Sequence, residues 1–228
     1  MFNIMSILTG TASHAPRVTP VVYSFLMSLI LLSIGMTRIC YKIPAYQTFW
    51  KRVQYCQIIA LYSWYLLAHF DITEALPFYH CRIATLAILF LPKGKLKAYF
   101  AYLGIAGAIC ALSYPIFDPY PFPHLTILSY VFGHMALLIN ALTYLYQNNS
   151  SVQLSFKNIL QITFIMNMVI GLADLILQAN YGFLRETPIL ASQNGILNVL
   201  IVSLVIAILM TLVQALMSRE VERLAVRV

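Results

Sequence analysis

Long apolar segments alternate with short polar stretches along this chain. Each apolar segment holds few charged residues, and each interruption brings charge, proline or asparagine. A helix that crosses a bilayer needs roughly 17–25 predominantly apolar residues. Segments of that length lie near residues 20–37, 53–71, 76–92, 97–114, 124–146, 158–179 and 195–217. The pattern predicts an all-α protein, a polytopic transmembrane helix bundle with about seven spans.

The series of apolar segments runs on without a long linker, a low-complexity tract or an internal repeat. We therefore expect a single transmembrane domain over residues 1–228. The third segment is the shortest and contains polar residues, so a search on hydropathy alone is prone to miss it. The tail over residues 218–228 is expected to be a helical extension at the cytoplasmic surface.

Positive charge is concentrated in every second loop; of the loops between, two have none and the third carries Arg185 beside Glu186. The two loops without positive charge carry Asp71 and Glu74, or Asp118. The positive-inside rule assigns basic loops to the cytoplasm. It predicts an N-terminus outside and a C-terminus in the cytoplasm. The basic residues that follow the odd-numbered spans or flank them are Arg38, Lys42, Lys51, Arg52, Lys93, Lys95, Lys97, Lys157, Arg219, Arg223 and Arg227.

The composition fits a membrane protein and excludes a water-soluble domain. Of the 228 residues, 61% are hydrophobic and only 9% are charged, against roughly 25% charged residues in soluble proteins. We expect a multi-pass protein of the cell membrane whose partners are membrane lipids. The net charge of +7 is spread over several loops, so no nucleic acid partner is expected. The four cysteines lie in or just past apolar segments, which argues against a disulfide framework.

Two histidines and a cysteine, namely His80, Cys81 and His134, stand inside apolar segments, and Asp174 is the single acid deep within a predicted span. Polar groups at membrane depth are costly and usually line a cavity or a site. The predicted topology places them in the outer half of the bundle. Cys81 lies about one turn below the outer end of its span, and His134 lies roughly 15 Å below the start of its own.

A thiol near an imidazole permits nucleophilic catalysis, in which the imidazole takes the proton and the thiolate attacks a carbonyl group. Adjacent residues on a helix point about 100° apart, so His134 is a better candidate base for Cys81 than His80 is. Asp174 or Asn180 is a candidate to orient that base. The alternative interpretation is a buried structural cysteine and a histidine that is hydrogen-bonded across helices.

A metal site is a second possibility, because imidazole and carboxylate groups bind zinc. The chain has no H-x-x-x-H or H-x-x-E-H spacing, which such sites often show. We therefore expect no metal and no cofactor. The residues that would offer ligands are His69, His80, His124, His134 and Asp174.

Two arginines are candidates for binding a lipid headgroup. Arg82 lies near the outer headgroup level, and Arg185 lies in the aromatic loop that joins the last two spans, beside Asn180 and Tyr181. Arginine pairs well with phosphate. The alternatives are a pair between Arg82 and Asp174, and an ordinary interfacial loop with a pair between Arg185 and Glu186.

Four motifs follow one another along the chain in an order that resembles a known family. They are Pro77-x-x-x-Cys81, the segment Tyr102–Pro115, the span around His134, and Asn180-Tyr-x-Phe-Leu-x-x-x-Pro188. This order, over about residues 55–217, resembles the YwaF-type family of prokaryotic integral membrane proteins. That family is similar to an animal transmembrane acyltransferase that remodels ether phospholipids through a cysteine and a histidine, and more distantly to androgen-induced lipid hydrolases with a threonine and a histidine.

The resemblance implies a nucleophile at Cys81 and a base at His134. The chain departs from the pattern at two positions: Tyr79 stands where a histidine is expected, and Asp174 where asparagine is expected. We predict a membrane-embedded enzyme for acyl transfer between lipids, or for ester hydrolysis, with its cavity open to the outer leaflet. Backbone or Asn180 donors would stabilise the oxyanion.

The alternative function is a small-molecule or ion transporter, or a binding bundle without covalent chemistry. A transporter needs polar groups through both halves of the membrane and often shows inverted repeats. The gathering of polar residues in the predicted outer half favours the enzyme.

Overall fold

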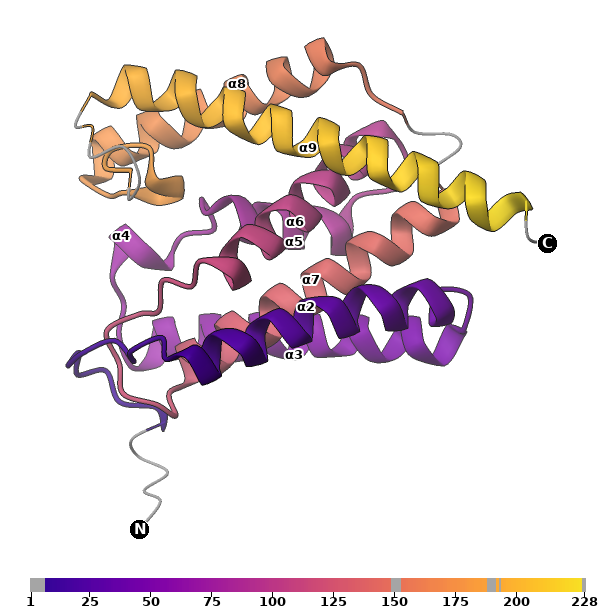
Figure 1. Ribbon diagram of the computed structural model, residues 1–228. Coiled ribbons are helices and arrows are strands. Elements are labelled where there is room, and N and C mark those ends of the chain that lie inside the picture. The colour runs from indigo at the N-terminus through magenta and orange to yellow at the C-terminus, as the bar shows by residue number, and fades with distance from the viewer. Residues whose placement is uncertain (1–6, 149–152, 188–191, 193, 227–228) are drawn as a thin grey trace. The chain divides into compact units, whose positions relative to one another are not determined.

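The computed structural model describes residues 7–148, 153–187, 192 and 194–226. Pro188 of the predicted aromatic loop and Arg227 of the predicted tail lie outside these residues. The described regular structure is helical throughout, in agreement with the predicted all-α class (Figure 1). Its elements are α2 (Pro20–Cys40), α3 (Pro44–Leu67), α4 (Ile72–Ala75), α5 (His80–Phe90), α6 (Lys95–Ser113), α7 (Leu125–Asn148), α8 (Phe156–Leu177), the 3-10 turn η2 (Tyr181–Phe183) and α9 (Gly195–Val226).

Each of the seven predicted segments contains a helix, and five helices have the length and composition of membrane spans, namely α2, α6, α7, α8 and α9. The other two differ. Helix α3 has 24 residues but carries Lys51 and Arg52 within it. Helix α5 has 11 residues, which gives a length of only about 16 Å against a hydrocarbon core of about 30 Å. The number of crossings and the orientation of the chain stay predictions.

The second helix starts earlier than the sequence pattern predicts. Pro44 occupies its first turn, where the fixed φ of proline suits a helix and its missing N–H is not needed. Lys51 and Arg52 therefore lie inside α3. The prediction from hydropathy, which placed them in a loop, was wrong. Hydropathy gave the later start because the first two turns of this helix are polar, although they are helical.

The third predicted segment is divided. Asp71 caps the short helix α4 by accepting a hydrogen bond from the Thr73 N–H at 2.8 Å. Pro77 follows, and the residue before a proline is disfavoured in helical conformation. Leu76 is accordingly extended. The helix resumes only at His80, so His80 and Cys81 stand at the start of a helix and not in its interior.

Polar residues fix several of the other helix ends. The side chains of Thr19 and Ser155 accept hydrogen bonds from N–H groups in the first turns of α2 and α8, and Asn194 does the same for α9. Such caps satisfy backbone groups that the helix leaves without a partner. Gln178 ends α8 in the left-handed conformation. The predicted helical tail is confirmed as far as Val226, where α9 ends.

The chain forms two compact units. The first comprises residues 1–70 and 107–143, and the second comprises residues 71–106 and 144–228. Helices α6 and α7 contribute residues to both. The expectation of a single transmembrane domain over the whole chain stays a prediction.

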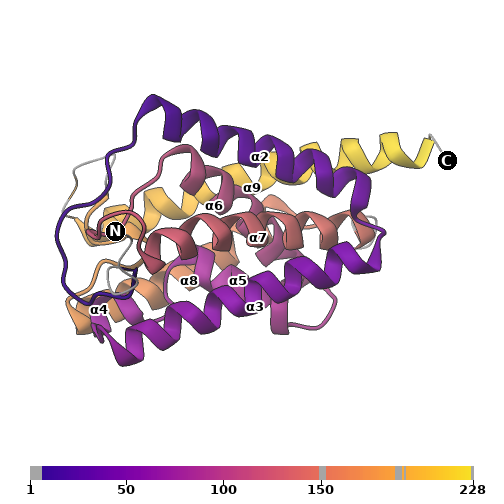
Figure 2. The same ribbon diagram turned by 90° about the horizontal axis from the view of Figure 1, so that it is seen from below.

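In the first unit, α7 lies beside α3 (Figure 2). The Gln57 Nε2 donates to the Ser129 Oγ at 2.7 Å, and the Asn140 Nδ2 donates to the Trp50 carbonyl at 3.2 Å. Gly133 permits this approach, because a Cβ there would lie 2.9 Å from the Gln57 Cδ. These contacts hold the backbone around His134.

In the second unit, α8 packs along α9 (Figure 1). The Tyr99 hydroxyl on α6 and the Thr163 hydroxyl on α8 are hydrogen-bonded at 2.8 Å. One core cluster joins the helix pair to the loop that follows α8. Its buried members are Ile170, Ala179, Tyr181, Leu184 and Val199. This cluster holds the loop over residues 178–187, which carries several of the predicted site residues.

Candidate functional site

Helix α5 begins with two of the predicted site residues. His80 is its first residue and Cys81 its second. Both side chains are partly buried, and Cys81 is a thiol. The N-terminal end of a helix carries partial positive charge, which stabilises an anion placed there. A thiolate at Cys81 would lie within that first turn.

The His80 ring is held by a chain of hydrogen bonds through α8 and α9. Its Nε2 lies 2.7 Å from the Asn167 Oδ1, the Asn167 Nδ2 donates to the Ser203 Oγ at 2.9 Å, and the Ser203 hydroxyl donates to the Val199 carbonyl at 2.6 Å. Because the amide oxygen can only accept, Nε2 carries the proton. In the neutral ring, Nδ1 then holds the lone pair.

The loop after α8 lies directly against the His80 ring. A Cβ on Gly182 would be 2.5 Å from the His80 Cε1 and 2.9 Å from its Nδ1. Gly182 also has φ of 61°, a conformation that L-residues with a side chain rarely adopt. Glycine is therefore required here both for its backbone angle and for its size.

Asp174 shapes the same loop. Its side chain is 2% exposed, and its Oδ1 accepts a hydrogen bond from the Tyr181 N–H at 2.7 Å. The Asp174 carbonyl accepts from the Gln178 and Ala179 N–H groups as α8 ends. Its Oδ2 is buried and makes no hydrogen bond within the described part of the chain. The carboxylate thus anchors the turn from α8 into the loop.

Tyr181 connects this loop to the segment before α5. Its ring is fully buried, its hydroxyl donates to the Ile72 carbonyl, and that oxygen accepts from the Leu76 N–H at 3.1 Å. Its ring lies edge-on to Phe78 and Tyr79, with centroids 5.5 and 5.1 Å away. Burial raises the pKa of the Tyr181 hydroxyl, so the group stays protonated and keeps its role as a donor.

Asn180 folds the exposed side of the loop. Its Oδ1 accepts from the Arg185 and Glu186 N–H groups at 3.1 and 3.0 Å, and its Nδ2 donates to the Glu186 carbonyl at 3.0 Å. Asn198, on α9, donates to the Arg185 carbonyl at 3.0 Å. The Asn180 amide is engaged in the loop itself, while the Arg185 side chain is exposed.

Arg82 binds the backbone that precedes α5. Its Nη1 donates to the Glu74 and Leu76 carbonyls, the latter at 3.2 Å. Its guanidinium group stands 4.8 Å from the centre of the Tyr79 ring. These contacts fold residues 74–79 against the first turn of α5, next to Cys81. Arg82 therefore has a structural role, whether or not it also meets a headgroup.

His134 lies on α7, in the first unit, as the tenth residue of that helix. Its Nδ1 is 2.7 Å from the Tyr130 carbonyl. A carbonyl can only accept, so Nδ1 carries the proton and Nε2 holds the lone pair of the neutral ring. The Tyr130 ring packs on the imidazole at 4.5 Å, and the Tyr130 hydroxyl donates to the Ala111 carbonyl at 2.6 Å.

The orienting bond to His134 thus comes from its own helix. The sequence had offered Asp174 or Asn180 for this role. Those two side chains form hydrogen bonds within the loop after α8, and their part in orienting His134 stays a prediction. The second unit gathers the other predicted site residues, which are His80, Cys81, Arg82, Asp174, Asn180, Tyr181 and Arg185.

Two polar groups of the site were missed by the sequence analysis. Asn167 and Ser203 hold the His80 ring, but each is an uncharged polar residue with apolar neighbours in a long, mainly apolar helix. Near His134, Gln54 and Gln57 form a further polar pair at 3.0 Å. The signal for all four was the same: an uncharged polar residue inside an apolar segment, which at membrane depth needs a partner.

The histidines do not assemble into a metal site in the part of the chain that the structure describes, where no three His, Cys, Asp or Glu side chains are grouped to hold an ion. His124 shows why. Its Nε2 donates to the Thr9 carbonyl at 3.0 Å and its Nδ1 accepts from the Thr126 N–H at 3.2 Å, so both nitrogens are engaged. It stacks on Tyr120 at 4.1 Å. Burial lowers the pKa of the His124 ring.

Apolar helices long enough to cross a bilayer, joined by short loops, define a multi-pass helical membrane protein. The polar residues of its two units are held by specific hydrogen bonds. The chain belongs to the TMEM164 family, whose sequence model matches residues 9–217. Comparison with curated proteins gives no match, and neither does comparison with solved structures.

Proposed function

We propose that this protein is an enzyme of the cell membrane that transfers acyl groups between lipids, or hydrolyses lipid esters, with Cys81 as nucleophile and His134 as general base. The observation that carries the proposal is the hydrogen bond from the His134 Nδ1 to the Tyr130 carbonyl at 2.7 Å. It fixes the tautomer whose Nε2 accepts a proton. A base held in one orientation by a third group is the arrangement that activates a nucleophile.

The position of Cys81 supports its role as that nucleophile. It is partly exposed, it is a thiol, and it stands in the first turn of α5. The dipole of the helix favours a thiolate there, and the same dipole favours the oxyanion that forms when the thiolate attacks. We assign the oxyanion to this helix end in preference to Asn180, whose amide is engaged in its own loop.

The proposed reaction has two steps. The His134 Nε2 takes the proton from the Cys81 thiol, and the thiolate attacks the carbonyl carbon of a lipid ester. The carbon–oxygen bond of the ester breaks, the leaving alcohol takes the proton from His134, and a thioester remains on Cys81. An acceptor hydroxyl or amine, or water, then loses its proton to His134 and attacks the thioester, which releases the thiolate.

The lipid substrates would meet the protein from the outer leaflet in the predicted orientation. We propose Arg185 as a contact for their phosphate, because its side chain is exposed on the loop next to the start of α5. Arg82 is the second candidate, although its guanidinium group also binds two backbone carbonyls.

A trapped thioester tests the mechanism. The purified protein, placed in nanodiscs that contain phosphatidylcholine with an alkyne-tagged acyl chain, is expected to acquire the tag on Cys81. Neutral hydroxylamine should release it, because it cleaves thioesters. Tagging should disappear in Cys81→Ala and persist in Cys110→Ala, a matched cysteine in an apolar helix. Equal tagging of both variants would contradict a nucleophile at Cys81, and would leave the transporter or binding bundle as the better proposal.

The pairing of the two residues needs its own experiment, because they belong to different units. In a variant with Cys40, Cys56 and Cys110 replaced by serine, we expect the His134→Cys position to form a disulfide with Cys81 on mild oxidation. A disulfide requires Cα atoms within about 7 Å. The matched control is Ala141→Cys, about 10 Å further along α7 on the same face. Crosslinking of the control alone would show that Cys81 faces a different turn of α7.

A further inference from the structure

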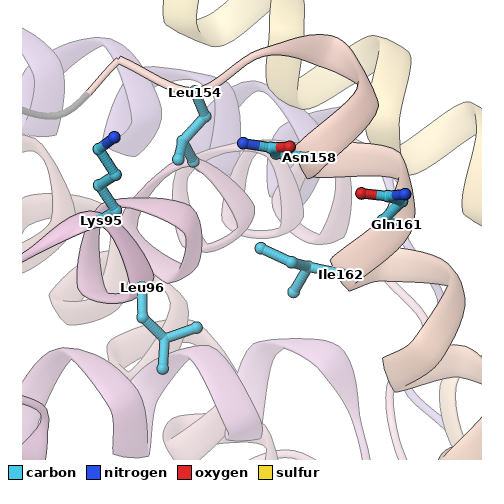
Figure 3. A pocket seen from close by; sticks show the side chains of 6 residues that line it. All are labelled: Lys95, Leu96, Leu154, Asn158, Gln161 and Ile162. Carbon is cyan, nitrogen blue, oxygen red and sulfur yellow. The ribbon is translucent and has the colours of Figure 1, made fainter.

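A pocket lies between the first turns of α6 and α8, in the second unit (Figure 3). Its volume is about 320 Å³, at the small end of the range for ligand sites. Asn158 and Gln161 extend from α8 toward the side on which Lys95 and Leu96 stand (Figure 3). The lining residues are Lys95, Leu96, Leu154, Asn158, Gln161 and Ile162.

Two helices begin at this pocket. Lys95 and Leu96 are the first two residues of α6. Asn158 is the third residue of α8, whose start is capped by Ser155. The N-terminal end of a helix carries partial positive charge and N–H groups that favour anions. Two such ends beside one cavity make it a better site for an anion than either end alone.

Side-chain charge adds to the effect of the helices. Lys95 lines the pocket and is exposed, as is Lys157 beside Asn158. Residues 91–106 and 153–167 contain no Asp or Glu. Helix α9 approaches the segment before α8, where the Gln153 Nε2 donates a hydrogen bond to the Ser218 Oγ at 3.4 Å. The next two residues of α9, Arg219 and Glu220, carry opposite charges. The positive charge of Lys95 is therefore not cancelled within the lining.

The lining matches a phosphate group attached to an apolar molecule. Lysine and the amides of Asn158 and Gln161 supply hydrogen-bond donors for phosphate oxygens. Leu96, Leu154 and Ile162 supply an apolar wall. The pocket lies at the ends of two helices that qualify as membrane spans, and the ends of helices that span a bilayer meet its headgroup region. We propose that it binds the phosphate of an anionic phospholipid headgroup.

The predicted orientation places this pocket at the cytoplasmic leaflet, where anionic lipids attract lysine side chains. It is separate from the candidate catalytic residues of the same unit. Asn158 and Asp174 lie 16 residues apart on α8, which corresponds to about 24 Å of helix. A change at the pocket should therefore leave the chemistry at Cys81 intact, and the lipid held there is not the acyl substrate.

A titration tests the pocket. Short-chain phosphatidylglycerol, added to the full-length protein in neutral detergent, is expected to raise the Tm in a saturable way, and phosphatidylcholine and inorganic phosphate are not. The Lys95→Gln variant should bind phosphatidylglycerol about fivefold more weakly, since one lysine beside an anionic surface contributes about 1 kcal/mol. Adding Asn158→Leu should weaken binding at least tenfold in all.

The matched control is Lys93→Gln, which removes an exposed lysine two residues away that does not line the pocket. It should keep the wild-type affinity. An equal loss of affinity in Lys93→Gln and Lys95→Gln would show that the basic loop attracts the lipid in general. It would contradict a binding site in the pocket. A rise in Tm with inorganic phosphate as large as that with phosphatidylglycerol, or equal binding of phosphatidylcholine, would contradict the proposal that the ligand is an anionic phospholipid. Circular dichroism of the variants shows whether each is folded.

Discussion

Replacing Cys81 with alanine is expected to lower the rate of acyl transfer by about 10³-fold or more, because it removes the atom that forms the covalent intermediate. Replacing His134 with glutamine is expected to lower the rate by about 10²–10⁴-fold, the usual contribution of a general base. The rate is measured as transfer of a fluorescent acyl chain from phosphatidylcholine to a lysophospholipid in proteoliposomes. Neither variant should lose more than a few degrees of Tm.

The double variant distinguishes a catalytic pair from two independent residues. Residues that act as one unit are strongly non-additive, so Cys81→Ala with His134→Gln should be no slower than Cys81→Ala alone. Cys110→Ala and His14→Gln are the controls, because His14 is an exposed histidine near the N-terminus. A rate for His134→Gln within threefold of the wild type would remove His134 from the mechanism, and a rate unchanged in Cys81→Ala would remove the covalent step.

The arrangement of the loop after α8 explains why a glycine, an aspartate and a tyrosine are needed so close to Cys81. Asp174 holds the Tyr181 N–H, Tyr181 holds the backbone before α5, and Gly182 rests on His80. The loop and the start of α5 therefore form one structure through a small number of contacts. A change in any of these contacts should be transmitted to the position of the thiol.

Hydropathy predicted where helices occur, because a helix that crosses the lipid must satisfy its backbone hydrogen bonds internally. Such a helix needs a continuous run of apolar residues, which can be read directly from the sequence. It failed where a local conformational rule decides instead. Pro44 begins α3 ahead of its apolar part, and Pro77 breaks the third segment so that α5 starts at His80. Both prolines were visible in the sequence, but hydropathy weighs composition and not backbone angles.

The partners of the site residues depend on which helices pack together, and hydropathy and residue spacing do not reveal that packing. His80 meets Asn167 across 87 positions of the chain. Tyr181 meets Ile72 across 109. By contrast, the bond from His134 to Tyr130 joins residues four apart on one helix, so helix geometry alone permits it to be anticipated. The sequence analysis did not include this bond because it considered side chains and not the backbone carbonyl.

Changing Gly182 to alanine is expected to destabilise the protein by about 2–5 kcal/mol. The left-handed backbone angle costs roughly 1–2 kcal/mol for a residue with a side chain, and crowding in a packed region costs about 1–3 kcal/mol more. The new Cβ would lie 2.5 Å from the His80 Cε1, so the ring or the loop must move. Thermal unfolding in detergent should show a Tm lower by roughly 5–15 °C, at about 2–4 °C per kcal/mol for a chain of this size.

The control for Gly182 is Gly35→Ala, in the interior of α2, where a Cβ would meet nothing within 4 Å. Alanine is better than glycine inside a helix by roughly 0.5–1 kcal/mol, so the Tm should stay the same or rise slightly. Removing the ring that the Cβ strikes should relieve the crowding but not the backbone strain. The variant with both Gly182→Ala and His80→Ala should therefore be more stable than the sum of its single changes predicts, as expected for residues in contact. Strictly additive stability changes, or a Tm in Gly182→Ala equal to that of the wild type, would mean that the loop does not pack against His80. The inferred connection between the loop and the Cys81 thiol would then be wrong as well.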